Sequence, residues 1–390
     1  MLSTVPGPPA PQRQHRSTAA SALATAPVVA FYEVTRACAL VCQHCRACAQ
    51  PKRDPLELTG EQSLALIAEL ARFEPAPIVV LTGGDPLERP DVFDLVRAGT
   101  ARGLRMAMTP SATPKLTDAA LAELGAAGLS RLALSLDGAQ AKTHDAFRGV
   151  PGSHARTWRA LDAARELGLT LQVNTTVTTS TVRELDALAH QLAGAGISLW
   201  SLFFLVPTGR AQREQCLDAV AMEDCFARLA QIADRAPFAV KTTEAPHYRR
   251  FLAQRAGSLP SRARPEGMKV RPGTAADRKI PAGIGDGKGV LFIDHRGTIH
   301  PSGFLPLTCG QFPRDSIVDV YQTHTLFLNL RNPDALAGKC GRCEFRNVCG
   351  GSRARAHAAS GDPLGEDPDC AYQPPLRATP PKGALRATGS

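Results

Sequence analysis

Two groups of cysteines have the spacing best suited to chemistry in this sequence. The first comprises Cys38, Cys42 and Cys45, with the pattern Cys-x3-Cys-x2-Cys. The second lies near the other end of the chain and has the pattern Cys-x2-Cys-x5-Cys-x20-Cys. Clustered thiols among an odd total of eleven cysteines are typical of metal ligation in a reducing compartment rather than of a disulfide framework. The second group consists of Cys340, Cys343, Cys349 and Cys370.

The first cysteine group lies on a short loop directly after the predicted strand Val28 to Thr35. Three thiolates on one loop can hold three irons of a [4Fe-4S] cluster and leave the fourth iron open to a small molecule. The alternative is a zinc site that uses Cys42, Cys45 and Cys48 with a fourth ligand, although zinc knots rarely follow the first strand of an α/β domain. We therefore expect an iron–sulfur cluster, with Cys48 as a spare thiol.

The second cysteine group can complete the ligand set of a metal centre by itself. Its distant member, Cys370, would tie the end of the chain back onto the segment before it. From the spacing alone, zinc and an iron–sulfur cluster are about equally compatible with these four thiols.

A glycine pair follows the second predicted strand, Ile78 to Leu81. The segment Thr82 to Pro86 reads Thr-Gly-Gly-Asp-Pro. Because glycine lets a backbone approach a ligand closely, the carbonyls at Gly83 and Gly84, together with the Asp85 carboxylate, suit a protonated amine. Such a segment is also a common turn, and its position one strand after the cysteine loop is what favours a binding site.

An alternation of strands and helices must position these loops, because apolar residues recur with period 2 and then with helical spacing from Val28 to about Leu205. Six strand–helix repeats predict a parallel barrel or an open doubly wound sheet, and in either the site lies at the carboxyl ends of the strands. Capping hydroxyls are expected at Thr59, Thr117 and Thr181. The other predicted strands are Leu104 to Thr109, Arg131 to Leu136, Leu171 to Val177 and Ser198 to Leu205. The predicted helices are Thr59 to Phe73, Asp91 to Arg102, Thr117 to Ala126, Ala155 to Leu167 and Thr181 to Ala193.

The rest of the chain divides by composition. A helix near Met222 to Ala236 precedes a basic, Pro- and Gly-rich connection, and a hairpin is expected where Val290 to Asp294 and Thr298 to His300 flank a turn. We expect a flexible tail at 1–27, a catalytic core at 28–215, a helix and basic linker at 216–288, a cysteine-bearing unit at 289–374 and a disordered tail at 375–390.

Composition excludes several classes of protein. With 44% apolar residues the chain can bury a core, and no window approaches the roughly 18 to 20 apolar residues of a membrane span. The stretch from Ser17 to Tyr32 makes a poor export signal, so we expect a cytoplasmic protein. The net charge of +9 arises from 45 basic and 36 acidic residues that are mostly interleaved, which suits a carboxylate-bearing ligand as well as a nucleic acid.

The cysteine loop and the Gly-Gly-Asp-Pro segment together resemble the radical S-adenosylmethionine (SAM) enzymes, over about Val28 to Arg210. The resemblance implies a partial (β/α)6 barrel of TIM type, a [4Fe-4S] cluster on Cys38, Cys42 and Cys45, and SAM bound beside Gly83, Gly84 and Asp85. It also implies an external one-electron donor such as flavodoxin or ferredoxin. His44 stands where the family often has an aromatic residue near the adenine. Further SAM contacts implied at strand ends are Ser111, Ser135, Asp137, Asn174 and Arg210, each of which is equally typical of a turn or a cap.

The second cysteine group resembles the SPASM or Twitch extension of these enzymes, which holds an auxiliary [4Fe-4S] cluster. The longer SPASM pattern has more upstream cysteines than this chain, where only Cys309 is available and Ser302 follows Pro301. The resemblance therefore implies one auxiliary cluster on Cys340, Cys343, Cys349 and Cys370, while the spacing does not decide whether Cys309 takes part.

Three segments resemble the radical enzymes of alternative heme biosynthesis, which include one that decarboxylates Fe-coproporphyrin III propionates to vinyls. These segments are Phe204 to Arg210, Pro301 to Leu307 and Cys349 to Ala356. A tetrapyrrole substrate is thus implied, and Arg353 and Arg355 either pair with its carboxylates or form a solvated helix face. The rival within the class is a maturase of ribosomally made peptides. The rival outside it is a zinc-stabilised basic nucleic-acid-binding protein, which would not need the Gly-Gly-Asp-Pro segment.

Overall fold

The centre of the structure, a computed structural model that describes residues 18–257 and 283–375, is a curved sheet of ten strands. Strands β1 to β7 follow one another in parallel, and β8 pairs in parallel with the other side of β1. β9 and β10 continue beyond β8 as antiparallel strands. The sheet is thus an incomplete α/β barrel, which confirms the predicted fold class. The strands are β1 (Val29–Thr35), β2 (Ile78–Gly83), β3 (Arg105–Met108), β4 (Arg131–Ser135), β5 (Leu171–Val177), β6 (Leu199–Phe204), β7 (Ala239–Thr243), β8 (Val290–Ile293), β9 (Thr298–His300) and β10 (Gly310–Gln311).

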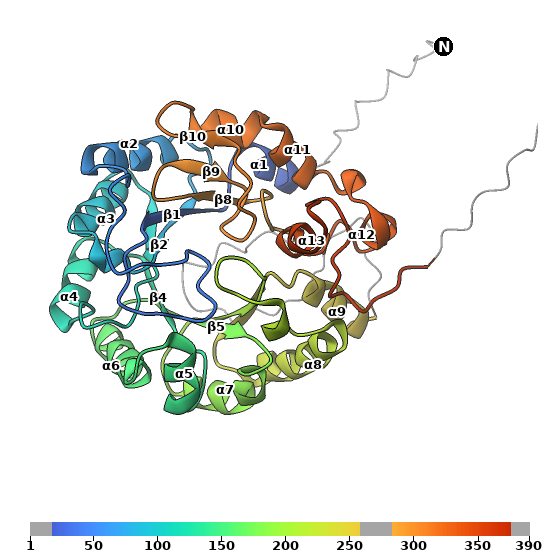
Figure 1. Cartoon of the computed structure of the whole chain (residues 1–390), viewed down its shortest axis with the longest axis horizontal. Coiled ribbons are helices and arrows are strands. Elements are labelled where there is room, and N and C mark those ends of the chain that lie inside the picture. Colours follow the sequence, from blue (N-terminus) through green and yellow to red (C-terminus); the bar gives the residue numbers. More distant parts are fainter. Residues whose placement is uncertain (1–17, 258–282, 376–390) are drawn as a thin grey trace, which may run out of the picture.

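Helices form a ring around the outside of the sheet (Figure 1). Those that follow β1 to β6 return the chain to the start of the next strand, as right-handed parallel connections require. The helices are α1 (Thr18–Thr25), α2 (Gly60–Leu70), α3 (Val92–Ala101), α4 (Asp118–Ala126), α5 (Ala141–Arg148), α6 (Ser153–Glu166), α7 (Leu185–Ala193), α8 (Ala219–Arg235), α9 (His247–Arg255), α10 (Ile317–Thr323), α11 (Thr325–Arg331), α12 (Gly338–Arg342) and α13 (Arg353–Ser360).

Two of the three expected caps are present. Thr59 and Gln62 form a complete capping box at α2, and the Thr117 hydroxyl accepts from the Ala120 amide at α4. The prediction for Thr181 was wrong, because its hydroxyl donates to the Thr176 carbonyl at 2.6 Å and α7 begins only at Leu185. A hydroxyl with a nearer strand carbonyl as partner is not available to cap a helix.

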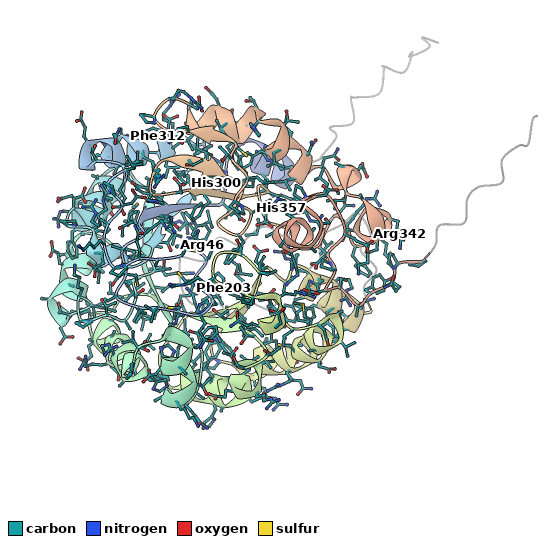
Figure 2. All side chains as sticks on the ribbon, in the orientation of Figure 1. Arg46, Phe203, His300, Phe312, Arg342 and His357 are labelled. Carbon is teal, nitrogen blue, oxygen red and sulfur yellow. The ribbon has the colours of Figure 1, made fainter. Side chains whose placement is uncertain are left out.

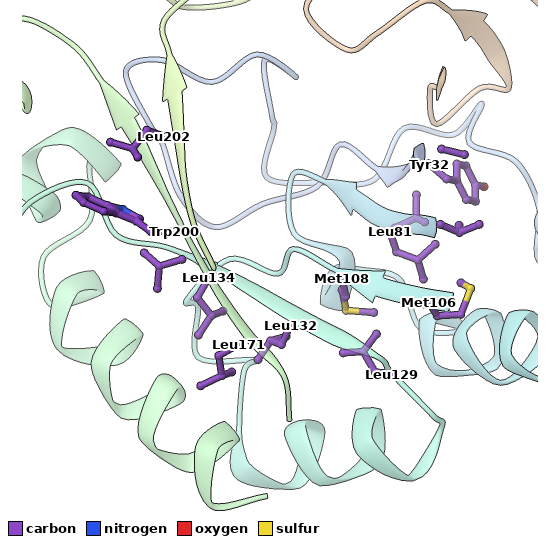
Figure 3. Packing of buried hydrophobic residues seen from close by; sticks show 14 of the residues in the cluster. Tyr32, Leu81, Met106, Met108, Leu129, Leu132, Leu134, Leu171, Trp200 and Leu202 are labelled. Atoms are coloured by element: carbon purple, nitrogen blue, oxygen red, sulfur yellow. The ribbon is translucent and has the colours of Figure 1, made fainter. Parts of the chain in front are cut away.

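The strands present two different faces because successive side chains alternate across a sheet. On β2, Val79 and Leu81 point outward into the main core against the helices. Figure 3 shows that core at Leu81, Met106, Leu132 and other residues of its cluster. Val80 points inward and packs with Val29 and Ala107 in a separate, smaller cluster. The inner face therefore lines the interior of the barrel.

Three predictions of segment character need correction, and one helix was not predicted. The expected linker at 216–288 contains a further strand, β7, and a helix, α9. The predicted hairpin forms, but it joins the core sheet through the pairing of Val29 with Val290, so residue 289 is no boundary of the sheet. Helix α1 lies within the expected tail at 1–27, where the Leu23 carbonyl accepts from the Tyr321 hydroxyl at 2.8 Å. α5 was not predicted.

The remaining expectations about tails and linker fall on residues 1–17, 258–282 and 376–390, which lie outside the described residues. Within the described part of the chain, no helix is long and apolar enough to cross a membrane.

Candidate active site

A cavity of about 470 Å³ occupies the inside of the curved sheet. Its wall includes the first cysteine loop, the glycine pair and inward-facing side chains of β1 to β8. It also includes the segment Cys349 to Arg353 of the second cysteine group. Figure 2 shows Arg46 and Phe203, two residues of this wall, near the centre of the ring of helices. The fold thus brings segments about 300 residues apart to one cavity.

The first cysteine loop presents Cys38, Cys42 and Cys45 to the cavity, whereas Cys48 does not line it. Backbone amides donate to two of the thiols: Leu40 to Cys38 Sγ and Ala49 to Cys45 Sγ, both at 3.3 Å. Burial raises the pKa of Cys38 to about 11. Amide donors favour the thiolate form that a metal requires, so the donor set and its hydrogen bonds fit an iron–sulfur cluster.

Arg148 supports the same loop from α5. Its Nη1 donates to Cys42 Sγ at 3.8 Å, and its Nη2 lies 2.6 Å from Asp137 Oδ2. Asp137 also accepts from the Thr176 amide at 2.8 Å and does not line the cavity. The predicted SAM contact at Asp137 is therefore not where the structure places this carboxylate, which instead anchors the arginine behind Cys42.

The glycine pair packs against the loop that carries the cysteines. Gly84 donates to the Thr35 carbonyl at 2.9 Å, and a Cβ at Gly84 would lie 2.3 Å from the Ala37 carbonyl oxygen. Gly83 has a φ of +144°, and a Cβ there would meet the Thr35 carbonyl oxygen at 2.1 Å. Only glycine allows this approach. Both glycines line the cavity beside the thiols, where the sequence had placed a cosubstrate.

The Asp85 carboxylate points away from the cavity. It is completely buried and accepts from the Thr113 hydroxyl at 2.8 Å and from the amides of Leu87 and Ser111. Burial raises its pKa to about 6. The contact of this carboxylate with an amine stays a prediction, and its acceptor positions join the loops after β2 and β3.

Three of the other predicted SAM contacts line the cavity, namely Ser111, Ser135 and Asn174. The Ser111 hydroxyl donates to the Gly84 carbonyl at 3.0 Å. Ser135 pairs with Asn174, Asn174 with Ser201, and Ser201 with Lys241, so these residues form a polar row across β4 to β7. All four line the cavity.

Arg210 lies beside the cysteine loop, and His44 belongs to it, between Cys42 and Cys45. Arg210 does not line the cavity, and its amide donates to the Cys45 carbonyl at 3.1 Å. Among the described residues, its Nε and Nη2 have no hydrogen-bond partner. His44 does line the cavity and stacks on Phe147 with ring centroids 4.1 Å apart. Burial lowers its pKa to about 3, so it is a neutral flat ring at neutral pH.

A buried charge network lies behind Arg46. The Arg46 guanidinium pairs with Glu33 at 2.7 Å and lies 4.5 Å from the centre of the Phe292 ring. His295 bridges Glu33, at 2.9 Å, and Asp54, at 3.2 Å. Burial disfavours a charged imidazole, but the hydrogen bonds to Glu33 and Asp54 and the charges of Glu33 and Asp294 outweigh it and raise the pKa of His295. This network joins the β8–β9 turn to the wall of the cavity.

The second cysteine group surrounds a small pocket beside the cavity, lined by Cys340, Cys343, Cys349 and Cys370. Cys340 Sγ receives the Asp367 amide at 3.4 Å, and Cys349 Sγ receives the Gly351 amide at 3.4 Å. Within residues 18–257 and 283–375, no three His, Cys, Asp or Glu side chains lie close enough to hold a single metal ion, and this holds for the first cysteine loop as well as for the second group. Of the four, Cys349 also lines the large cavity.

Arg353 and Arg355 are both buried, which contradicts the solvated helix face. Arg355 is 1% exposed and its Nε lies 3.0 Å from Asp367 and 3.5 Å from Asp369. Arg353 is also buried, although it borders the cavity, and donates to Cys340 Sγ at 3.6 Å and to the Gly365 carbonyl at 2.6 Å. These arginines fix the cysteine-bearing loops, and neither forms a solvated helix face.

Among the cations that line the cavity, sequence reasoning missed Lys241 and Lys288. Lys241 of β7, Arg249 of α9 and Lys288 just before β8 all line it. The two carboxyl groups of this wall belong to Glu244 and Asp286, and the first hydrogen-bonds Ser352 Oγ at 2.6 Å. Burial, followed by the charge of Asp286, raises the pKa of Glu244. An inward-facing lysine inside a predicted strand would have been the signal, but β7 itself was not predicted.

Comparisons with known proteins place this site in context. Residues 32–192 match the family described as the radical SAM superfamily. The AdoMet-dependent heme synthase of Methanosarcina barkeri is 36% identical over 353 residues, which cover 90% of this chain and 99% of the relative. The pre-heme d1 synthase of Dinoroseobacter shibae is 28% identical over 377 residues, which cover 92% of this chain and 90% of the relative.

A solved structure shares the fold. The crystal structure of Streptococcus suis SuiB superposes with a TM-score of 0.67 at 15% identity and covers 89% of this chain and 78% of that one. At this identity the likeness concerns the fold alone. The superposition supports the incomplete barrel and its extension as one architecture.

Proposed function

The chain belongs to the radical SAM superfamily, in the group of AdoMet-dependent heme synthases, and from this premise we propose that it converts propionate side chains of Fe-coproporphyrin III to vinyl groups. The motifs at Cys38 to Cys45 and Thr82 to Pro86 had predicted the superfamily. The reaction class is oxidative decarboxylation, and the tetrapyrrole comes from the names of the relatives.

The residues of the first cysteine loop fit the cofactors that this chemistry needs. Cys38, Cys42 and Cys45 would hold a [4Fe-4S] cluster, and the backbone of Gly83 and Gly84 would border SAM. When bound, and given one electron from an external donor such as flavodoxin or ferredoxin, these groups supply a 5'-deoxyadenosyl radical that removes a hydrogen atom from the substrate. His44 would offer a neutral ring to the adenine, since it stacks on Phe147 at the same wall.

The rest of the reaction requires an acceptor for one electron. After a hydrogen atom leaves the side-chain carbon, loss of carbon dioxide forms the vinyl double bond and leaves one electron to remove. Cys340, Cys343, Cys349 and Cys370 would hold an auxiliary [4Fe-4S] cluster that supplies the acceptor. Cys349 supports this role because it borders both the small pocket and the large cavity.

The chain's own residues enclose and orient the substrate. The apolar inner face at Val29, Val80 and Phe292 suits a flat macrocycle, while Arg46 and Lys241 offer charges to its carboxylates. All eleven cysteines are unpaired, which supports a reducing, cytoplasmic location.

One observation carries the proposal: one cavity is lined by the first cysteine loop, by Cys349 of the second group and by several cationic side chains. Anaerobic incubation of the reconstituted protein with Fe-coproporphyrin III, SAM and dithionite should give a product lighter by one or two formic-acid equivalents in mass spectrometry. Intact substrate, together with no binding of any iron or metal-free porphyrin in an absorption titration, would overturn the tetrapyrrole assignment. The peptide-modifying interpretation would then take its place.

A further inference from the structure

Three cations meet on the cavity wall far from the first cysteine loop. Lys241 belongs to β7, the last strand at one edge of the sheet. Lys288 immediately precedes β8, whose first residues pair with the start of β1, whereas the cysteine loop follows the end of β1. Arg249 of α9 lies between them and donates to the carbonyls of Ile284, at 2.9 Å, and Val348, at 3.4 Å. We refer to Lys241, Arg249 and Lys288 as the cation cluster.

In the described part of the chain the cation cluster has no carboxylate counter-ion, and the negative charge that acts on Arg249 is that of the Cys349 thiolate. Among the described residues, none of its three members forms an ion pair with a carboxylate, as the other buried arginines Arg148 and Arg355 do. Of the two carboxyl groups on the wall, Glu244 accepts from Ser352, and Asp286 Oδ2 accepts from the Ala354 amide at 3.0 Å, while Asp286 Oδ1 has no hydrogen-bond partner among the described residues. Like charges held together inside a protein are costly without an anion.

The pKa values of the two lysines of the cation cluster show the same repulsion. Lys241 keeps some accessible surface, which faces the cavity, but lies deep in the molecule. Burial, and then the charges of Arg249 and Arg131, lower its pKa to about 8. Burial and Arg249 also lower the pKa of Lys288. An anion that entered the cavity would relieve this repulsion and hold both lysines in the charged form.

We infer that the cation cluster is a subsite for the carboxylates of substrate side chains that do not react in a given turnover. The inference rests on the proposed function, because it takes the ligand to be a tetrapyrrole with several propionates. Carboxylate is the chemistry that lysine and arginine together recognise by charge-assisted hydrogen bonds.

The position of the subsite fits this division of roles. The reacting side chain must lie near Cys38, Gly84 and Ser111, at the ends of β1 to β3. Lys241 stands on the polar row that begins at Ser135, three strand spacings away, or about 14 Å along the sheet at 4.8 Å per strand. A rigid macrocycle held at both places has its reacting carbon fixed, because its distant carboxylates cannot slide.

The test uses anaerobically reconstituted full-length protein and two probes, Fe-coproporphyrin III and its tetramethyl ester. We expect Lys241→Met to raise the Kd of the acid about tenfold, a free-energy change of about 1.4 kcal/mol, and Lys241→Arg to restore binding. The ester should bind weakly to the wild type and lose nothing further in Lys241→Met. Lys142→Met, on the exposed face of α5, is the matched control and should bind the acid as the wild type does.

Several outcomes would overturn the inference. An unchanged Kd for the acid in Lys241→Met contradicts it, and so does an equal loss for acid and ester, which would mean a general distortion of the cavity. A weaker affinity for SAM with an unchanged affinity for the porphyrin would assign the cluster to SAM instead. If Lys241→Met does not fold, Lys288→Met carries the same test. If the wild type binds no porphyrin, the proposed function fails together with the subsite. If the wild type binds the porphyrin and the lysine variants bind it with the same Kd, the subsite fails and the proposed function stands.

Discussion

The two cysteine groups place thiols at the same cavity by different means. The first is local: Cys38, Cys42 and Cys45 lie on one loop after β1, held by backbone amides and by the close approach of Gly84. The second gathers residues 340 to 370 around a pocket and depends on buried ion pairs of Arg355 with Asp367 and Asp369. The first group is therefore sensitive to backbone shape, and the second to buried charge.

Removal of the first thiols should have the largest effect. The triple variant with Cys38, Cys42 and Cys45 replaced by Ala should lose about half of the iron and all cleavage of SAM, because the second group cannot replace an open iron. Iron analysis and chromatography of 5'-deoxyadenosine measure both quantities. Cleavage that persists in the triple variant would contradict the assignment of the first group.

Replacement of Gly84 by alanine should cause nearly the same loss of SAM cleavage. In Gly84→Ala the new Cβ would meet the Ala37 carbonyl oxygen at 2.3 Å, so the cysteine loop must move. We expect SAM cleavage to fall by about 100-fold, as 1 Å misplacements in active sites do, while the second cluster stays loaded. Gly125→Ala on α4 is the control, since its Cβ has ordinary contact with Leu169 at 3.7 Å. Equal activity of the two variants would contradict the local account.

The second group should respond to charge instead. Asp367→Asn removes the partner of buried Arg355, a change that costs about 3 to 5 kcal/mol in comparable buried pairs. Iron bound by the second group should fall while 5'-deoxyadenosine still forms. Asp94→Asn, whose pair with Arg97 is exposed, should behave as the wild type in the same urea unfolding and iron assays. Full iron content in Asp367→Asn would show that the ion pairs are dispensable.

The smallest expected effect concerns pH and the network that joins the β8–β9 turn to the first group. The pKa of His295 is raised above its usual 6.5, so its contribution to stability is complete below about pH 6.5 and is lost as the pH rises through the folded value. The difference in unfolding free energy between wild type and His295→Gln should therefore shrink from pH 6 to pH 9. His190→Gln, exposed on α7, is the control. A difference that is constant over this range would contradict a charged His295.

The contrast between the two groups also explains what the sequence could predict. Short-range patterns identified β1 to β6 and the cysteine and glycine loops, because strand periodicity and motif spacing are local properties. β7 was missed because its sequence, Ala-Val-Lys-Thr-Thr, combines an edge position with an inner face on a polar cavity, and so it lacks an apolar alternation. The pairing of β8 with β1 joins residues about 260 apart and has no local signal.

The direction of side chains is the part of the site that the sequence could not predict. Asp85 and Asp137 lie at the expected strand ends, but both carboxylates turn away from the cavity to bind neighbouring loops. Sequence position places a residue at a strand end and does not say which of its neighbours its side chain will meet. Arg355 was likewise expected to contact a ligand or the solvent. Its ion pairs could not be foreseen, because its partners Asp367 and Asp369 come from a separate loop.

One measurement tests most directly whether two cysteine groups serve one cavity with separate roles. In Cys343→Ala, single-turnover reaction with SAM, dithionite and Fe-coproporphyrin III should still form some 5'-deoxyadenosine, because the first group is intact, but no decarboxylated product. Cys225→Ala, a buried cysteine of α8 that does not line the cavity, is the matched control and should form both. Loss of 5'-deoxyadenosine in a folded Cys343→Ala protein, or normal product formation, would contradict the division of labour between the two groups.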